Sequence, residues 1–188
     1  MYYDFWTVKE EELLKRLGFQ PVNLAVAVIA PKNADELKYL AEKNKTADFI
    51  VLHKPNEKVL KVAVDNCNID ATDEFVKYPL IKKMAERNIA VLINFNELLK
   101  AFNLQKTLYL MSRTVKLAKR HKTPIIISSG AQTKWELRSA SDLIGFCEVI
   151  GMTAGEAKKT LYDHQERVLN RKELKKTGKW VSPGVRVV

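Results

Sequence analysis

The chain has 188 residues, of which 46% are hydrophobic and 29% charged, so it can bury one hydrophobic core and is not a disordered chain. Its 32 Lys and Arg residues outnumber its 22 Asp and Glu residues, for a formal net charge of +10. A basic protein most often binds nucleic acid, an anionic membrane surface is the rarer alternative, and the charge could also serve solubility alone.

The first half of the chain predicts short apolar strands that alternate with amphipathic helices. Two capping pairs, Thr7 with Glu10 and Asn33 with Glu36, mark helix starts, and Gly18 ends the first helix. Strands are expected at Tyr2–Trp6, Asn23–Ala30, Phe49–His53 and, weakly, Ile69–Ala71. Helices are expected from Thr7 to Leu17, from Asn33 to Lys43 and over Glu57–Asp65.

The second half continues the same alternation. Pro79 suits the first turn of a helix that ends near Arg87, with Asn88 as its terminator. Strands are expected at Ile89–Phe95 and Pro124–Ser128, both of them continuous apolar runs suited to burial on two faces. Further helices are expected after Leu98, over Ser141–Ile150 and Thr153–Tyr162, with a last turn near Gln165–Leu169.

Strand and helix alternate six times without a Gly-rich fingerprint, which predicts an α/β protein with a parallel sheet and helical crossovers. The sheet is either doubly wound or closed as a barrel, and periodicity alone does not choose between them. One domain is expected over residues 1–170. The last segment, 171–188, is predicted to be a mobile basic C-terminal tail.

The helix after Leu98 has an unusual charge pattern. No Asp or Glu occurs between Glu97 and Glu136. Apolar residues at Leu104, Leu108, Met111, Val115 and Ala118 predict one buried stripe, and Lys106, Arg113, Lys116 and Arg120 project to the opposite side together with Tyr109. An ordinary solvated helix face mixes signs, because Glu–Lys pairs stabilise the helix. These cations span about 21 Å, which matches several successive phosphates and predicts binding of nucleic acid.

Few residues suggest catalysis. None of His53, His121 and His164 is spaced as a metal-ligand pair, although His53 is expected at the carboxyl end of a strand, where barrel active sites lie. The carboxylates Asp4, Asp65, Asp70 and Asp73 could in principle gather Mg²⁺, but Asp near helix starts is usually a cap. The run Ser128-Ser129-Gly130 is either a phosphate-binding turn or an ordinary tight turn. We therefore expect no catalytic residue and no metal site in the chain.

The remaining signals concern the cellular compartment. Cys67 and Cys147 form neither a disulfide framework nor a CxxC metal site, so two buried, reduced thiols are expected. The N-terminus has no basic region followed by an apolar run, and no apolar stretch approaches the roughly 18 residues that span a bilayer. A cytoplasmic protein without membrane contact is the expectation.

A set of short motifs resembles a known family. Ile125-Ile126-Ile127 leads into Ser128-Ser129-Gly130-Ala131, then Trp135-Glu136-Leu137-Arg138-Ser139, Asp142-Leu143 and Ile150-Gly151-Met152 with Ala157, all after the basic helix. In order and composition this resembles the archaeal ribonuclease P protein component three, the family of the eukaryotic p-thirty subunit. The resemblance covers about Leu98–Leu161. The family usually has Pro where this chain has Ala140, and the chain lacks the strand-end histidines of the distantly similar barrel metal-hydrolases.

The resemblance implies a TIM-barrel-like parallel (β/α) barrel, here short, with two very short strands or an incomplete barrel. It also implies a subunit of ribonuclease P, the endonuclease that removes the 5′ leader of precursor tRNA. In that family the RNA carries out cleavage with bound Mg²⁺, and the protein itself binds no cofactor and is expected to cleave nothing alone. The implied partners are the ribonuclease P RNA, the Pop-five-like component two in a heterotetramer, and other ribonuclease P proteins.

The candidate RNA-binding residues combine both lines of reasoning. The resemblance places RNA contact on Arg113, Arg120 and Arg138, and charge alone adds Lys106 and Lys116. The loop cations Lys54 and Lys134 complete the set. Arg138 could equally serve a buried salt bridge that fixes its loop.

Two other functions stay open at the level of sequence. One is a stand-alone barrel metal-dependent phosphoesterase that uses carboxylates and His53. The other is a basic protein-interaction subunit that touches no RNA, which the salt dependence of binding would separate from an RNA-binding subunit.

Overall fold

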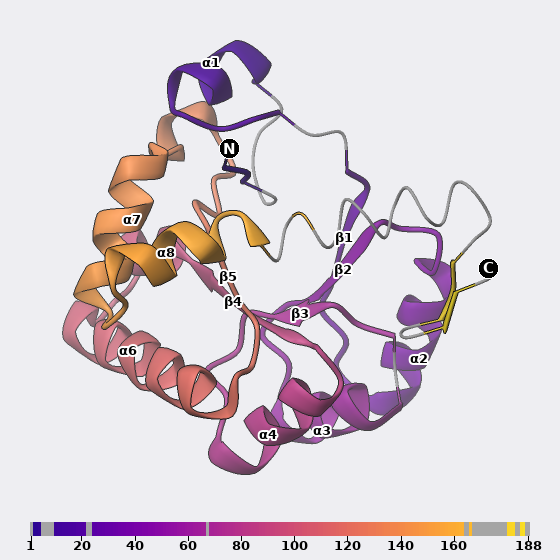
Figure 1. Cartoon of the computed structure of the whole chain (residues 1–188). Coiled ribbons are helices and arrows are strands. Elements are labelled where there is room, and N and C mark those ends of the chain that lie inside the picture. The colour runs from indigo at the N-terminus through magenta and orange to yellow at the C-terminus, as the bar shows by residue number, and fades with distance from the viewer. Residues whose placement is uncertain are drawn as a thin grey trace.

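The computed structural model describes residues 2–4, 10–21, 24–66, 68–163, 166, 180–182 and 185–186. Five parallel strands form its main sheet in the order β1-β2-β3-β4-β5 (Figure 1). Their bounds are β1 Val26–Ile29, β2 Phe49–Leu52, β3 Ala71–Thr72, β4 Ala90–Asn94 and β5 Ile125–Ser128. A separate antiparallel pair, β6 Trp180–Ser182 and β7 Val185–Arg186, lies near the C-terminus.

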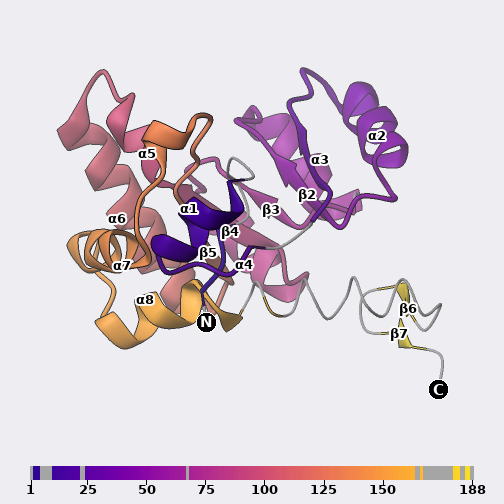
Figure 2. The ribbon, with the colours of Figure 1, turned by 90° about the horizontal axis from the view of Figure 1, so that it is seen from above.

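The helices surround this sheet on its outer side (Figures 1 and 2). They are α1 Glu11–Arg16, α2 Ala34–Lys43, α3 Glu57–Asn66, α4 Tyr78–Glu86, α5 Phe95–Leu99, α6 Leu104–His121, α7 Ala140–Val149 and α8 Ala154–Thr160, with a 3₁₀ turn, η1, at Lys134–Glu136. None of the helices in this described part of the chain is both long and apolar enough to cross a membrane.

The strictly sequential strand order decides between the two architectures that the sequence left open. A doubly wound sheet reverses its strand order at a switch point, which sends helices to both faces. Here every crossover proceeds in one direction, and because such crossovers are right-handed, the helices gather on one face. The prediction of a TIM-barrel-like α/β fold is confirmed. Among the described strands, β1 and β5 are the two edges of the sheet.

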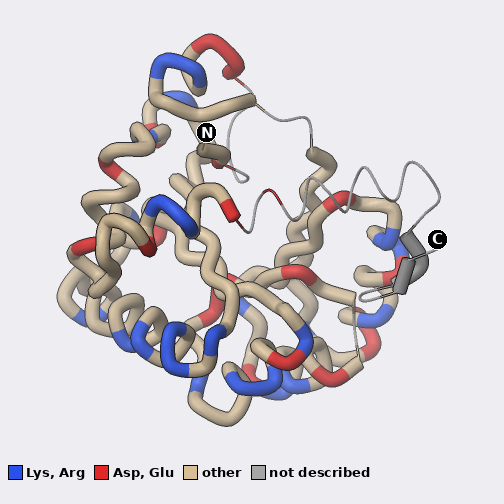
Figure 3. Tube along the Cα trace, viewed as in Figure 1, with Lys and Arg blue, Asp and Glu red and all other residues tan. Residues whose placement is uncertain are grey.

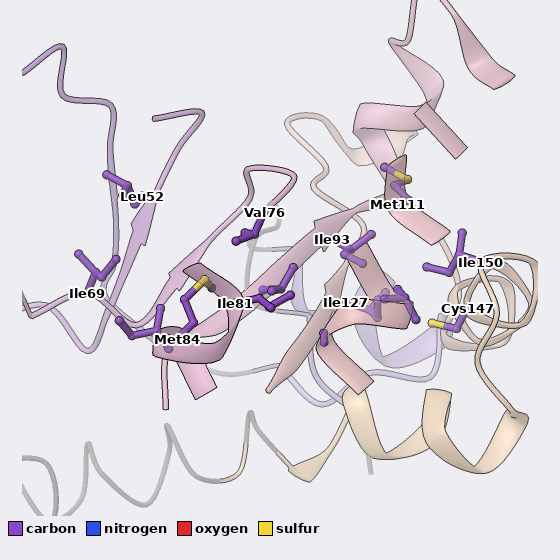
Figure 4. Packing of buried hydrophobic residues seen from close by; sticks show 14 of the residues in the cluster. Leu52, Ile69, Val76, Ile81, Met84, Ile93, Met111, Ile127, Cys147 and Ile150 are labelled. Carbon is purple, nitrogen blue, oxygen red and sulfur yellow. The ribbon is translucent and has the colours of Figure 1, made fainter. Parts of the chain in front are cut away.

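Alternate residues of each strand fill two separate hydrophobic layers. Ile50, Val91, Ile93 and Ile127 point outward into the large core between sheet and helices, which also contains Met84, Met111 and Ile150 (Figure 4). Their neighbours point to the inner face, where a smaller cluster contains Phe49, Val51, Leu92, Ile126 and Tyr3. This inside–outside alternation is the packing of a barrel wall, and it explains why these strands are apolar at every position.

The N-terminal segment lies along β5. The backbone N–H of Tyr3 donates to the carbonyl of Leu161 at 3.2 Å, and Ser128 Oγ, at the end of β5, donates to Asp4 Oδ1 at 2.6 Å. Instead of the first strand expected at Tyr2–Trp6, the described residues show one isolated parallel bridge between Tyr2 and Phe19. The rest of that predicted strand, including Trp6, and the cap expected at Thr7 fall outside the described residues.

Most other elements match their predictions. The Asn33 side chain accepts from the N–H of Glu36 at 2.9 Å, Pro79 occupies the first turn of α4, and Gly18 ends α1 with φ +89°. The sequence did not predict α5, because Phe95 prolongs an apolar run that reads as strand although helix begins there. Cys147 is fully buried and burial raises its pKa to about 12, as expected for an inert thiol; Cys67 lies outside the described residues.

The domain boundary at residue 170 stays a prediction. Residues 171–179 and most of the turn expected at Gln165–Leu169 lie outside the described part of the chain. Within the expected tail, the described residues are those of the β6–β7 pair.

Candidate nucleic-acid interface

Helix α6 is the longest described element, and its two ends are fixed by local chemistry. The Asn103 side chain accepts from the N–H of Lys106 at 2.9 Å and caps the first turn. At the other end Lys122 adopts the left-handed conformation, with φ +57°, and stops the helix. The result is an 18-residue rod that packs against α4 and α5.

The inner face of α6 is buried over a shorter length than the sequence predicts. Met111, Thr114, Val115 and Ala118 are the buried residues of the helix. The predicted apolar stripe is wrong at its first position, since Leu104 is 51% exposed. The physical reason is that residues 102–106, which include the first three residues of the helix, are all exposed and do not pack on the core.

The outer face carries the predicted cations. Lys106, Arg113, Lys116 and Arg120 are all exposed, and Tyr109 lies among them with 64% of its surface open. Among the described residues, no carboxylate lies within ion-pair distance of these four side chains. Basic positions follow α6 without an intervening acid, whereas acids and bases mix along α3 and α4 (Figure 3). We call these four residues the α6 cation row.

One further cation of α6 behaves differently. Lys119 Nζ lies 2.8 Å from Glu156 Oε2 on α8 and donates to the carbonyl of Gly151 at 3.2 Å. The hydrogen bond from Lys119 and a second from the N–H of Thr153 hold the pKa of Glu156 below its usual value. Lys119 therefore joins α6 to α8 and is not part of the row.

Lys54 lies apart from α6, at the carboxyl end of β2. Its Nζ is 2.9 Å from Glu97 Oε1 on α5, and its backbone N–H donates to Asp73 Oδ1 at 2.8 Å. The role of Lys54 as an RNA contact stays a prediction. An RNA phosphate bound to Lys54 would compete with Glu97 for the ammonium group.

Arg138 stabilises the loop in which it lies. Its Nη1 donates to the carbonyls of Leu137 at 2.8 Å and Trp135 at 3.3 Å, and its guanidinium stacks 5.4 Å from the Phe95 ring centre. The buried salt bridge considered from sequence is not what fixes this loop: Glu136, the nearest acid in sequence, pairs with Lys100 at 3.1 Å. Arg138 holds the loop through carbonyls and an aromatic face, and an RNA contact by the same side chain is untested.

Lys134 lies on the same loop, within η1. Its Nζ is 5.0 Å from the centre of the Trp135 ring, in a cation–π contact, and both side chains are exposed. The sequence reasoning singled out Lys134 for its charge but gave no binding role to Trp135, which is 81% exposed. The position of Trp135 could have indicated its exposure, because it lies inside a capping box in a turn that follows a buried strand.

Of the residues considered for catalysis, His53 and Asp73 come together, whereas Asp65 and Asp70 bind other groups. His53 Nδ1 lies 2.5 Å from Asp73 Oδ2 at the carboxyl ends of β2 and β3, while Asp65 is bound to Lys83 on the outer helices and Asp70 Oδ2 accepts from the N–H of Ile50. Within the described residues, no group of three or more His, Cys, Asp or Glu side chains could hold a metal ion.

The other candidate groups also have structural roles. The His121 ring packs edge-on against Tyr78 at 5.0 Å, and His164 is outside the described residues. The Ser128-Ser129-Gly130 run is a tight turn: Gly130 has φ +65°, and the hydroxyl of Ser128 and the N–H of Ser129 both donate to the carboxylate of Asp4. The Asp4 carboxylate thus already accepts hydrogen bonds from two of the groups that could have bound a phosphate.

Comparison with known proteins gives a consistent result. A family model described as RNase P subunit p30 matches residues 26–177. Ribonuclease P protein component 3 of Methanococcus maripaludis strain C7 is 29% identical over 133 residues, which cover 65% of this chain and 57% of that protein. The same component of Thermococcus kodakarensis is 26% identical over 168 residues, which cover 84% of this chain and 74% of that protein. The chain thus spans less than two thirds of the Methanococcus relative's length.

A solved structure has a similar fold over the whole chain. It is a chain in a cryo-EM structure of archaeal ribonuclease P with mature tRNA, with a TM-score of 0.78 and 20% sequence identity, covering 100% of this chain and 86% of that one. At this identity the match bears on the fold alone.

Proposed function

This chain belongs to the RNase P subunit p30 family, and from that premise we propose that it is a protein subunit of ribonuclease P, the ribonucleoprotein endonuclease that removes the 5′ leader of precursor tRNA. The relatives named above are ribonuclease P components, and the solved neighbour is part of an archaeal ribonuclease P with tRNA. Membership confirms the resemblance that the SSGA, ELRS and IGM motifs carry.

The observation that carries the proposal is the α6 cation row. Four exposed cations follow one face of a rigid helix over about 21 Å, a length that matches several successive phosphates of a nucleic-acid backbone. Their mutual repulsion is relieved when phosphates lie along the row. The row would screen RNA charge and position RNA helices, and so lower the Mg²⁺ concentration at which the RNA folds and acts.

In this proposal the RNA carries out the chemistry and binds the Mg²⁺. The polar groups at the carboxyl ends of the strands support this division of labour, because they are engaged with one another: His53 with Asp73, Lys54 with Glu97 and Ser128 with Asp4. A stand-alone metal-dependent phosphoesterase is not favoured, because His53, Asp4 and Asp65 lie on separate elements and bind separate partners.

The proposed partners are the ribonuclease P RNA, the Pop-five-like component two in a heterotetramer with this chain, and the other ribonuclease P proteins. The resemblance implies that these proteins act in one particle, and we propose the cytoplasm as its location. The particle in the solved neighbour, archaeal ribonuclease P with mature tRNA, supports the assignment of RNA as a partner.

Cleavage of precursor tRNA by reconstituted components tests the proposal. With the RNA and the remaining protein subunits at low Mg²⁺, addition of this chain should raise the cleavage rate, and the chain alone should cleave nothing. A rate that is identical with and without the chain at every Mg²⁺ concentration would refute the proposed function. Metal-dependent cleavage by the chain alone, lost in His53→Ala, would instead support the phosphoesterase.

A further inference from the structure

Exposed apolar side chains gather on two loops beside the start of α6. Nine large hydrophobic side chains are exposed in the described part of the chain, and four of them, Leu99, Phe102, Leu104 and Trp135, lie between the end of α5 and the first turn of α6 or in η1. Phe102 is exposed over its entire surface and Trp135 over 81% of it. Isolated exposed leucines are ordinary, whereas two largely exposed aromatic rings on adjoining loops are costly in water and indicate a partner.

The two loops are joined by polar contacts. Lys100 Nζ, at the end of α5, donates to Gln132 Oε1 at 3.0 Å and lies 3.1 Å from Glu136 Oε1. Asn96 Nδ2 on α5 donates to the carbonyl of Gly130 at 3.0 Å and to Glu136 Oε2 at 3.2 Å. The segment after β5 accordingly lies beside α5 (Figure 2). The Phe102 loop and the Trp135 loop therefore form one surface.

The backbone that carries Trp135 is held on both sides. Glu136 Oε2 accepts from the N–H of Gln132 at 2.7 Å, and Arg138 donates to the carbonyl of Trp135. The hydrogen bond from Gln132 and the ammonium of Lys100 keep the pKa of Glu136 below its usual value, so this anchor is charged at neutral pH. A loop whose backbone is already held loses little conformational entropy when it binds a partner.

Phe102 lacks the intramolecular contact that its position usually makes. It precedes the helix cap Asn103, and a hydrophobic residue at this position commonly packs against the fourth helical residue. Here that residue is Thr107, whose hydroxyl donates to the carbonyl of Asn103, and Phe102 stays solvated. The helix start does not need this ring, which leaves it available for binding.

The charges around these rings indicate the kind of partner. Lys134 covers part of the Trp135 ring, and Lys106 opens the α6 cation row four residues after Phe102. Exposed aromatic rings interleaved with cations are typical of surfaces that stack unpaired bases and hold the adjoining phosphates. On the basis of the proposed function, we propose that unpaired nucleotides of RNA stack on Trp135, with Phe102 as a second ring on the joined loop.

The test measures affinity of the full-length chain for a single-stranded RNA of about ten nucleotides and for an RNA duplex of similar charge. Trp135→Ala should weaken single-strand binding by about 5- to 100-fold, because one stacked base is lost. It should leave the slope of affinity against salt and the duplex affinity unchanged. Trp135→Phe should keep most of the affinity and Trp135→Leu should lose it, because stacking needs an aromatic face and not merely apolar volume.

Tyr39→Ala is the matched control. Tyr39 on α2 is 64% exposed with Lys43 over its ring at 5.9 Å, so it repeats the exposed cation–π pair away from the two loops, and its loss should not change RNA affinity. Equal single-strand affinity of Trp135→Ala and the wild-type chain would overturn the stacking site. It would also be overturned if Trp135→Leu fully activated cleavage while Trp135→Ala assembled more weakly with the protein subunits, which is the result expected for a protein partner. If the wild-type chain activates cleavage and only this test fails, the proposed function survives without the stacking site.

Discussion

Helices α4 and α6 pack side by side on the same outer surface, and both are basic, but their charges are arranged differently. Along α4 and its neighbour α3, cations meet acids of the same protein: Lys83 binds Asp65 at 2.8 Å and Lys77, just before α4, binds Glu57 at 2.6 Å. Along α6 the four cations of the row meet no acid among the described residues. The two helices also differ in net charge, because α4 carries two Lys and one Glu whereas α6 carries five Lys and Arg and no acid.

From this difference we expect a polyanion to bind along the α6 cation row. A cation already neutralised by a fixed carboxylate must lose that partner before it gains a phosphate, whereas a cation of the α6 row gains one at no such cost. Over α3 and α4 some cations are thus paired with acids of the same protein, whereas the α6 cation row meets none among the described residues.

The largest effect is expected from reversing the row. The triple variant Lys106→Glu, Arg113→Glu and Arg120→Glu should abolish activation of reconstituted ribonuclease P while the circular dichroism spectrum stays native, because all three side chains are solvent-exposed. The control reverses Lys38, Lys58 and Lys61 on α2 and α3, which are equally exposed and make the same change in net charge. Equal loss of activation in both triple variants would show that only net charge matters.

A smaller effect should separate two adjacent residues of α6. Arg120→Met removes a cation of the row and should lower the slope of log affinity against log salt by about 0.7 to 0.9, the value for one phosphate contact. Lys119→Met removes a cation that already binds Glu156 and should change the slope less. If the two variants show the same slope, the distinction between paired and unpaired cations has no bearing on RNA binding.

The same comparison predicts that removing an unpaired cation and removing a paired cation change the free energy of unfolding in opposite directions. Lys116 lies three residues after Arg113 and four before Arg120, so Lys116→Gln removes two repulsions and should raise the free energy of unfolding by about 0.5 kcal/mol. Lys83→Gln breaks an exposed ion pair and should lower the free energy of unfolding slightly. Urea denaturation of both variants measures these changes, and a loss of stability in Lys116→Gln would contradict the picture of crowded like charges.

The smallest effect concerns titration of the paired acids. The hydrogen bond from Lys83 lowers the pKa of Asp65 from its ordinary 3.8, and that from Lys119 lowers the pKa of Glu156 from 4.5. An acid whose pKa is lowered in the folded state stabilises the fold above the unfolded-state pKa and loses this contribution as pH falls through the folded-state value. NMR titration should show pKa values of Asp65 and Glu156 below 3.8 and 4.5, and Lys83→Gln and Lys119→Met should raise the pKa of Asp65 and of Glu156, respectively. Unshifted carboxylates in the wild-type chain would mean that these ion pairs do not form in solution.

Sequence reasoning was successful where one physical signal dominates. Continuous apolar runs located β2, β4 and β5, and the Asn33 cap located α2. The absence of acids from Lys100 to Trp135 located the α6 cation row. In each case the signal is local in the sequence, so no tertiary knowledge was needed.

The parts that the sequence did not reveal depend on contacts between distant residues. The strand order that excludes a doubly wound sheet is a tertiary fact, as is the exposure of Leu104. Arg138 reads equally well as an RNA contact or a salt bridge, and only the fold shows it bound to carbonyls and Phe95. The Trp135 surface was missed because Lys100 joins its two loops across more than 30 residues.

The salt dependence of RNA affinity tests the central claim most directly. For the ribonuclease P RNA, the plot of log affinity against log salt should be shallower by about 2 to 3 in the variant that reverses Lys106, Arg113 and Arg120, since three phosphate contacts are lost. The variant that reverses Lys38, Lys58 and Lys61 should retain the wild-type slope. Parallel lines for the wild-type chain and both variants would contradict the claim that the α6 cation row binds the RNA backbone.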